Sequence, residues 1–108
     1  TIEYYESAIE VDEKDADAYY NAGALLIEKA SEYYKEANDK DPSEYSNFNA
    51  YIKATDELTA TGKSFDERAL PYVEKTYELL PDDNAVKQAL KGIYTRLKMN
   101  DKAAALGI

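Results

Sequence analysis

The sequence predicts an all-α protein, and three observations support that prediction. Apolar and aromatic side chains recur every three or four positions along most of the chain, which is the spacing of one helical face. Only four glycines and three prolines occur in 108 residues, so little of the chain favours irregular structure. The hydrophobic content of 44%, with eleven tyrosines, is enough for the modest core of one small domain.

The first long helix is expected over residues 15 to 38. Asp15 is a suitable N-cap, because its carboxylate can accept a hydrogen bond from a free N–H group of the first helical turn. The apolar stripe then runs through Tyr19, Gly23, Leu26, Ala30, Tyr33, Tyr34 and Ala37. At 1.5 Å per residue, such a helix is about 35 Å long.

This helix is expected to end at residues 38 to 43, where Asn and Asp residues favour a turn. Pro42 disfavours helix at Asp41 but suits the first turn of a following helix. A returning stripe then consists of Tyr45, Phe48, Ile52, Thr55 and Leu58. The chain should therefore fold back on itself as a helical hairpin.

The returning chain is expected to form two helices, near residues 43 to 61 and 64 to 80. A single helix over this span would be longer than the outgoing one, and the segment at residues 61 to 64 contains Gly62, which favours a break. Ser64 and Glu67 match a capping box that would restart a helix. Pro71 then lies in the second turn, where it can kink the helix without ending it.

Small and aromatic residues also fall at the spacing of a helix-turn-helix repeat of ~34 residues. One unit is matched by Tyr19, Ala22, Gly23, Leu26, Ala69, Val73 and Pro81, a later unit by Leu90, Tyr94 and Ala103, and an earlier one by Tyr5 and Ala8. In these positions the chain resembles the tetratricopeptide repeat (TPR) family over most of its length. The resemblance implies an antiparallel helix-turn-helix stack, an α-α superhelix, in which small residues let helix backbones approach closely.

The resemblance divides a single domain, residues 1–108, into three parts. Residues 1–14 would be the second helix of a preceding repeat, 15–83 a repeat with one elongated hairpin, and 84–108 the first helix and the start of the second helix of the next repeat. The extra sequence in the middle unit is about one repeat long. If it formed its own repeat, Pro42 would lie deep inside a helix at a cost of roughly 3 kcal/mol. The chain opens and stops within expected helices, so we expect a fragment of a longer protein.

Charge is distributed unevenly along the chain. Residues 1–83 carry a net charge of −13 and residues 84–108 carry +4, which gives −9 overall. Such acidity argues against nucleic acid and anionic membranes as partners. The basic residues of the last part include Lys87, Lys91, Lys98 and Lys102, which are expected to share one face of the last helix. That face is either solvated or docks an acidic partner or the acidic half of a second copy.

Motifs for catalysis, metals and cofactors fail for physical reasons. The Gly-Lys-Ser sequence at residues 62–64 ends like a phosphate-binding loop, but Glu57 stands where that loop needs a glycine. Asp12, Asp15 and Asp17 lack the turn glycine and distal Glu of a calcium loop, so we expect them to cap helices. With no His and no Cys, the commonest transition-metal ligands and nucleophile–base pairs are missing. We therefore expect no enzyme activity and no cofactor.

Membrane insertion is not expected. No apolar run approaches the ~20 residues needed to span a bilayer, and no signal peptide opens the chain. We expect a soluble protein, either cytoplasmic or exported.

The TPR resemblance implies a protein that binds another protein or a peptide through the inner face of its first helices, or through the projecting hairpin. Carried over position by position, the binding residues would be Asp17, Tyr20, Asn21, Ala24, Ile27, Gln88, Thr95 and Arg96. Tyr20 and Ala89 stand where the carboxylate-binding members have Lys and Arg, so we expect no tight binding of a chaperone-type acidic C-terminus. The alternative is structural self-association as a homo-oligomer, in which the acidic front of one copy meets the basic rear of another.

Overall fold

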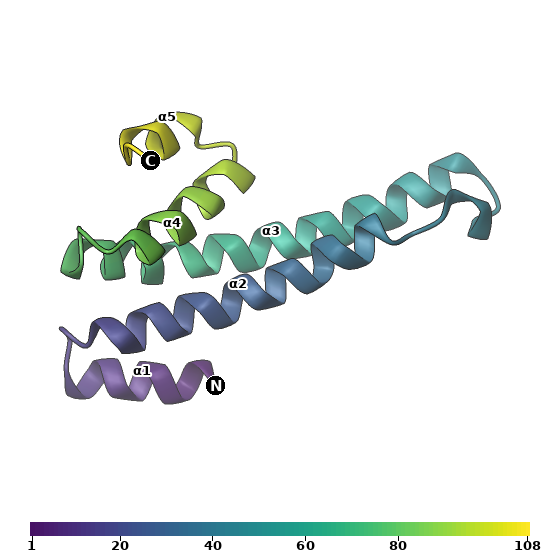
Figure 1. The fold of residues 1–108 in the computed structure, drawn as a ribbon. Coiled ribbons are helices and arrows are strands. Elements are labelled where there is room, and N and C mark those ends of the chain that lie inside the picture. The colour runs from purple at the N-terminus through teal and green to yellow at the C-terminus, as the bar shows by residue number, and fades with distance from the viewer.

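The computed structural model describes residues 1–108 and contains helices but no strands. In chain order the elements are α1 (Ile2–Val11), α2 (Ala16–Asn38), the short 3-10 helix η1 (Pro42–Glu44), α3 (Phe48–Leu79), α4 (Asn84–Arg96) and α5 (Asn100–Ala105). The all-α prediction is therefore confirmed, whereas the division into repeats stays a prediction. Figure 1 shows α2 and α3 as a long hairpin, with α1 beside α2 and α4 beside α3.

The helix expected over residues 15 to 38 is confirmed at both ends. Asp15 precedes α2, and its Oδ1 accepts a hydrogen bond from the N–H of Ala18 at 3.1 Å. An N-cap of the same kind begins α4, where the carboxylate of Asp83 accepts hydrogen bonds from the N–H groups of Ala85 and Val86. These caps satisfy donors that a first helical turn leaves without partners, so short polar residues fix where each helix begins.

The prediction of two returning helices is wrong, because α3 is continuous through residues 61–64. Gly62 is buried against α2, where a Cβ atom would lie 3.0 Å from Cε1 of Tyr34 and 3.2 Å from the carbonyl oxygen of Ala30. This glycine therefore serves a close helix contact and does not break the helix. Ser64 lies inside α3 and caps nothing, whereas Pro42 starts only the 3-10 helix η1.

Where α3 begins also differs from the expectation, whereas Pro71 lies inside the helix without ending it, as expected. Its N-cap is Asn47, whose side chain accepts a hydrogen bond from the N–H of Ala50 at 2.8 Å. Pro71 lies well inside α3 on its exposed side, where it does not end the helix. The returning helix thus starts six residues after Pro42 and runs unbroken to Leu79.

The core lies where α2, α3, α4 and α5 meet. Its buried members are Leu26, Ala69, Val73, Leu90, Ile93, Tyr94 and Ala103. The helices α2 and α3 also approach closely at Gly23, where an added Cβ would lie only 2.6 Å from Cγ2 of Val73. Such a distance is too short for two carbon atoms, so the interhelical spacing at this point requires glycine.

The outer half of the α2–α3 hairpin projects beyond the other helices (Figure 1), and the molecule measures 52 × 32 × 15 Å along its principal axes. We call the outer part of this hairpin, residues 39–58 with η1, the projecting hairpin. Near its tip, the ring of Tyr51 lies 5.9 Å from that of Tyr45 and 5.8 Å from that of Phe48, measured between centroids. The Phe48 residue remains 65% exposed, so the aromatic tip presents apolar surface to its surroundings.

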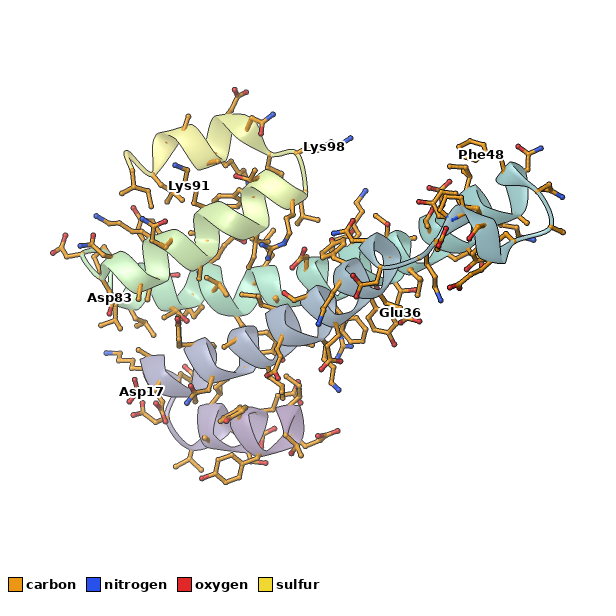
Figure 2. All side chains as sticks on the ribbon, turned by 45° about the vertical axis from the view of Figure 1, so that its right-hand side comes forward. Asp17, Glu36, Phe48, Asp83, Lys91 and Lys98 are labelled. Carbon is orange, nitrogen blue, oxygen red and sulfur yellow. The ribbon has the colours of Figure 1, made fainter.

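The expectation that four lysines share one helical face is wrong. Lys87 and Lys91 lie on α4 and Lys102 on α5, but Lys98 lies in the turn that joins those helices. The N–H of Lys98 donates to the carbonyl of Thr95 and that of Met99 to the carbonyl of Tyr94, the two hydrogen bonds of a Schellman motif. This turn redirects the chain after Arg96 and separates the lysines into different elements (Figure 2).

Candidate binding site

A buried ion pair joins three helices. Asp66 of α3 is 0% exposed, and its carboxylate accepts hydrogen bonds from Nε of Arg96 at 2.7 Å and from Nη2 of Arg96 at 2.9 Å. The hydroxyl of Tyr34 on α2 donates a third hydrogen bond to Asp66 at 3.0 Å. Because a buried carboxylate is costly without such partners, this network fixes α2 and α4 relative to α3.

The environment of this network changes the acidity of its members. Burial raises the pKa of the Tyr34 hydroxyl to about 12, and the hydrogen bond to Asp66 adds to the effect. The hydrogen bonds to the same carboxylate raise the pKa of Arg96. A neutral tyrosine and a charged arginine are therefore the stable forms beside Asp66.

Tyr34 should make the stability of the protein depend on alkaline pH. Because its pKa is raised from 10.0 to about 12 on folding, the stabilisation is fully present below pH 10 and is lost as the pH rises through about 12. We expect Tyr34→Phe to reduce this alkaline fall in the free energy of unfolding, measured by urea denaturation at several pH values. The control is Tyr33→Phe, since the Tyr33 ring stacks on Phe65 and its hydroxyl makes no hydrogen bond. Equal falls in the two variants would contradict this role of Tyr34.

Other tyrosine hydroxyls connect the remaining helices. Tyr94 of α4 donates to Oε2 of Glu74 on α3 at 2.6 Å, and the Nζ of Lys102 on α5 lies 5.9 Å from the centre of its ring. Tyr72 of α3 donates to Oε1 of Glu6 on α1 at 2.7 Å. Burial and these hydrogen bonds raise the pKa values of both hydroxyls. Several of the eleven tyrosines therefore hold helices together, and no buried side-chain nitrogen or oxygen lacks a hydrogen-bond partner.

A hollow of about 530 Å³ opens beside the buried ion pair, and we call it the arginine hollow. Its lining comes from three helices and the turn after α4, and consists of Tyr34, Ala37, Asn38, Thr59, Lys63, Arg96, Leu97 and Lys98. Three of these residues are cationic and none is a carboxylate. The hollow is thus a locally basic site on a chain whose net charge is −9.

A second hollow of about 130 Å³ lies between the N-terminal ends of α2 and α4, and we call it the tyrosine hollow. It is lined by Asp17, Tyr20, Thr76, Leu80, Asp83, Ala85 and Val86. Figure 2 shows Asp17 and Asp83 at the same end of the molecule, far from the projecting hairpin. The two hollows therefore lie toward opposite ends of the surface that α2 and α4 border.

The structure separates the eight residues predicted for binding. Asp17 and Tyr20 line the tyrosine hollow, and Arg96 lines the arginine hollow while also holding Asp66. The remaining residues line neither hollow and are exposed or half-buried, namely Asn21, Ala24, Ile27, Gln88 and Thr95. Ile27 also packs partly against the core. The structure thus brings Asp17 and Tyr20 together and places Arg96 in a different hollow, whereas binding by the eight residues stays a prediction.

Sequence reasoning missed Tyr34, Lys63 and Asp66 as parts of a site, and it placed Lys98 with other lysines than the ones found here. A signal for Asp66 existed, because it shares a helical stripe with Gly62, Ala69 and Val73, all of which are buried. A carboxylate in such a stripe indicates a buried ion pair. No comparable signal marked Lys63, and Lys98 was named only as part of a basic helical face that the structure does not contain.

The motifs considered for other chemistry have ordinary structural roles. The Gly-Lys-Ser segment at residues 62–64 is helical, and no cluster of three acidic side chains is arranged to hold a metal ion. None of the helices combines the length and the apolar composition that crossing a bilayer requires. Comparison with protein-family models, curated proteins and solved structures finds no match to this chain. Its function must therefore be argued from its own geometry.

Proposed function

We propose that this protein is a non-catalytic scaffold that binds an extended segment of a partner protein along the surface bordered by α2 and α4. The observation that carries the proposal is the placement of the two hollows, because α2 and α4 each contribute to both. From Tyr20 to Tyr34 the α2 helix rises about 21 Å, at 1.5 Å per residue. An extended peptide covers that distance with about six residues.

The residues between the hollows suit an extended ligand. Asn21, Gln88 and Thr95 are exposed polar side chains that can exchange hydrogen bonds with a peptide backbone. Ala24 and Ile27 are half-buried and offer apolar contact beside them. In the proposed TPR likeness this surface corresponds to the inner groove, whose residues bind a peptide and catalyse no reaction.

The tyrosine hollow would receive one side chain of the partner segment. Leu80 and Val86 make its lining partly apolar, and Tyr20 offers a large ring with a polar hydroxyl and little rotamer entropy to lose on binding. Asp17 and Asp83 at its border favour a segment that carries a basic or neutral residue at this point. Tyr20 is thus the residue whose loss should weaken capture most.

The proposal can be tested by placing a photoreactive benzoylphenylalanine at Gln88 and irradiating the protein in a lysate of its source. We expect one crosslinked partner, identified by mass spectrometry, whose yield falls several-fold in a Tyr20→Ala background. The matched control is Tyr4→Ala, because Tyr4 is an exposed tyrosine of α1 that lies outside both hollows. Equal yields in the two backgrounds, or no discrete partner, would contradict binding along this surface.

The alternative of self-association is favoured by apolar surface at both ends of the molecule. Val11 at the end of α1 is 89% exposed, and the aromatic tip of the projecting hairpin exposes Phe48 and Ile52. The acidic front and basic rear of the chain add complementary charge. Sedimentation at high protein concentration and low salt tests self-association, since a monomer under those conditions excludes it.

A further inference from the structure

We propose that the arginine hollow is an oxyanion site, which takes a carboxylate or phosphate group from a side chain of the bound segment. Only the source of the oxyanion rests on the proposed function, because the site itself is defined by this chain's own donors. Lys63 comes from α3, Arg96 from the last turn of α4 and Lys98 from the turn that follows. Three elements thus bring positive charge to one opening.

Both lysines of the hollow and one nitrogen of Arg96 have no partner within the chain. Lys63 and Lys98 take part in no ion pair and no side-chain hydrogen bond, whereas Lys29, Lys40 and Lys75 each have an acidic partner on the same chain. Arg96 uses Nε and Nη2 to hold Asp66, which leaves Nη1 without a hydrogen-bond partner. The amide of Asn38 adds a further polar group to the lining, whereas the hydroxyls of Tyr34 and Thr59 already donate to Asp66 and to the carbonyl of Thr55.

Asp66 positions the guanidinium group without cancelling the charge of the site. Its carboxylate is fully buried behind Arg96, and the two hydrogen bonds between them fix the plane of the guanidinium. The lining itself carries three positive charges and no carboxylate, while Asp66 lies behind Arg96 and Glu67 also acts on Tyr34. An oxyanion that enters from the open side meets a donor that is already oriented, so less conformational freedom is lost on binding.

The backbone at Lys98 has the left-handed conformation of the Schellman turn that ends α4. Lys98 has φ of 59°, a left-handed conformation that glycine adopts without strain and a lysine adopts only at a cost. The other residue with a similar φ is Gly107, at 72°, shortly after α5 ends. The chain thus uses glycine at one helix end and a strained lysine at the other. A strained residue that adds charge to a hollow points to a binding role.

Nuclear magnetic resonance titration of the 108-residue protein with two small probes tests this inference. The probes are N-acetyl-phosphoserine amide and N-acetyl-glutamate amide, which share a backbone and differ in the oxyanion. We expect shifts centred on the backbone amides of Thr59, Lys63, Arg96 and Lys98, with dissociation constants on the order of 1 mM. The probe that binds more tightly identifies phosphate or carboxylate as the natural group.

Two variants and one control separate binding from folding. Lys63→Gln and Lys98→Gly should each weaken binding about fivefold, the effect of one partly exposed ion pair. Lys98→Gly should at the same time raise the midpoint temperature of unfolding, because glycine relieves the strain. Lys53→Gln removes the same charge from an exposed position of the projecting hairpin and should leave binding unchanged.

Three results would overturn the assignment of an oxyanion site. Shifts spread over all lysines, no shifts at all, or unaltered affinity in Lys63→Gln and Lys98→Gly would each show that the hollow holds no oxyanion. Capture through Tyr20 would remain measurable in that case, so failure of the oxyanion site is distinguishable from failure of the scaffold role. Conversely, probe binding without any crosslinked partner would leave the site valid and refute the partner surface.

Discussion

Replacing Arg96 with Met is expected to lower the free energy of unfolding by about 3 kcal/mol. The substitution keeps most of the apolar stem but leaves the carboxylate of Asp66, which is 0% exposed, with only the Tyr34 hydroxyl as a partner. Because the Arg96 side chain is itself 34% exposed, the main cost comes from the unpaired carboxylate and not from the lost cation. Urea denaturation followed by circular dichroism measures the effect.

The control for this experiment is Arg68→Met, on the same helix as Asp66. The Arg68 guanidinium lies 5.4 Å from the centre of the Phe65 ring on an exposed surface, so its loss should cost less than about 1 kcal/mol. Adding Asp66→Asn to Arg96→Met should recover part of the stability, because a neutral amide is cheaper to bury than an unpaired charge. If Arg96→Met costs no more than Arg68→Met, the ion pair does not hold α4 in place.

Leu90→Ala is expected to cost about 3 kcal/mol, the usual range for a buried leucine whose cavity does not collapse. Leu90 of α4 is 1% exposed and belongs to the core shared with α3 and α5. Since α4 packs against α3 and α5, its loosening should spread mainly through those contacts. We expect hydrogen exchange to speed up most in α4 and α5, while the α1–α2 contact stays protected.

Leu58→Ala is the matched control, because Leu58 is a half-buried leucine of α3 within the projecting hairpin. It should cost about 1 kcal/mol and leave exchange in α4 unchanged. Uniform acceleration over all helices in Leu90→Ala would contradict the local opening and indicate one cooperative unit. That outcome would also affect the arginine hollow, because α4 carries Arg96, one of the donors of the hollow.

The extent of the first long helix was predictable because its determinants are local. Asp15 caps it through a hydrogen bond to Ala18, three residues away, and the apolar stripe has a helical period. The same local reasoning wrongly predicted a helix break at Gly62. Its role depends on the Tyr34 ring, 28 positions earlier in the chain, so local sequence favoured a break where tertiary contact keeps the helix continuous.

The candidate site was only partly predictable for a similar reason. Arg96 was named from its register, but its binding partner Asp66 lies 30 positions earlier and on another helix. Lys98 was placed on a regular helical face, whereas a Schellman turn moves it to the edge of a hollow. Spacing along a chain predicts which residues share one helix face, but it does not predict which faces converge.

The unbroken course of α3 gives the molecule a mechanical property. One helix extends from the aromatic tip, past Asp66, to the end that borders the tyrosine hollow. A continuous helix resists bending, so a force applied near Phe48 is transmitted along α3. A partner that binds the aromatic tip therefore acts on the same helix that holds Arg96 through Asp66, and no proline interrupts that helix between Phe48 and Asp66.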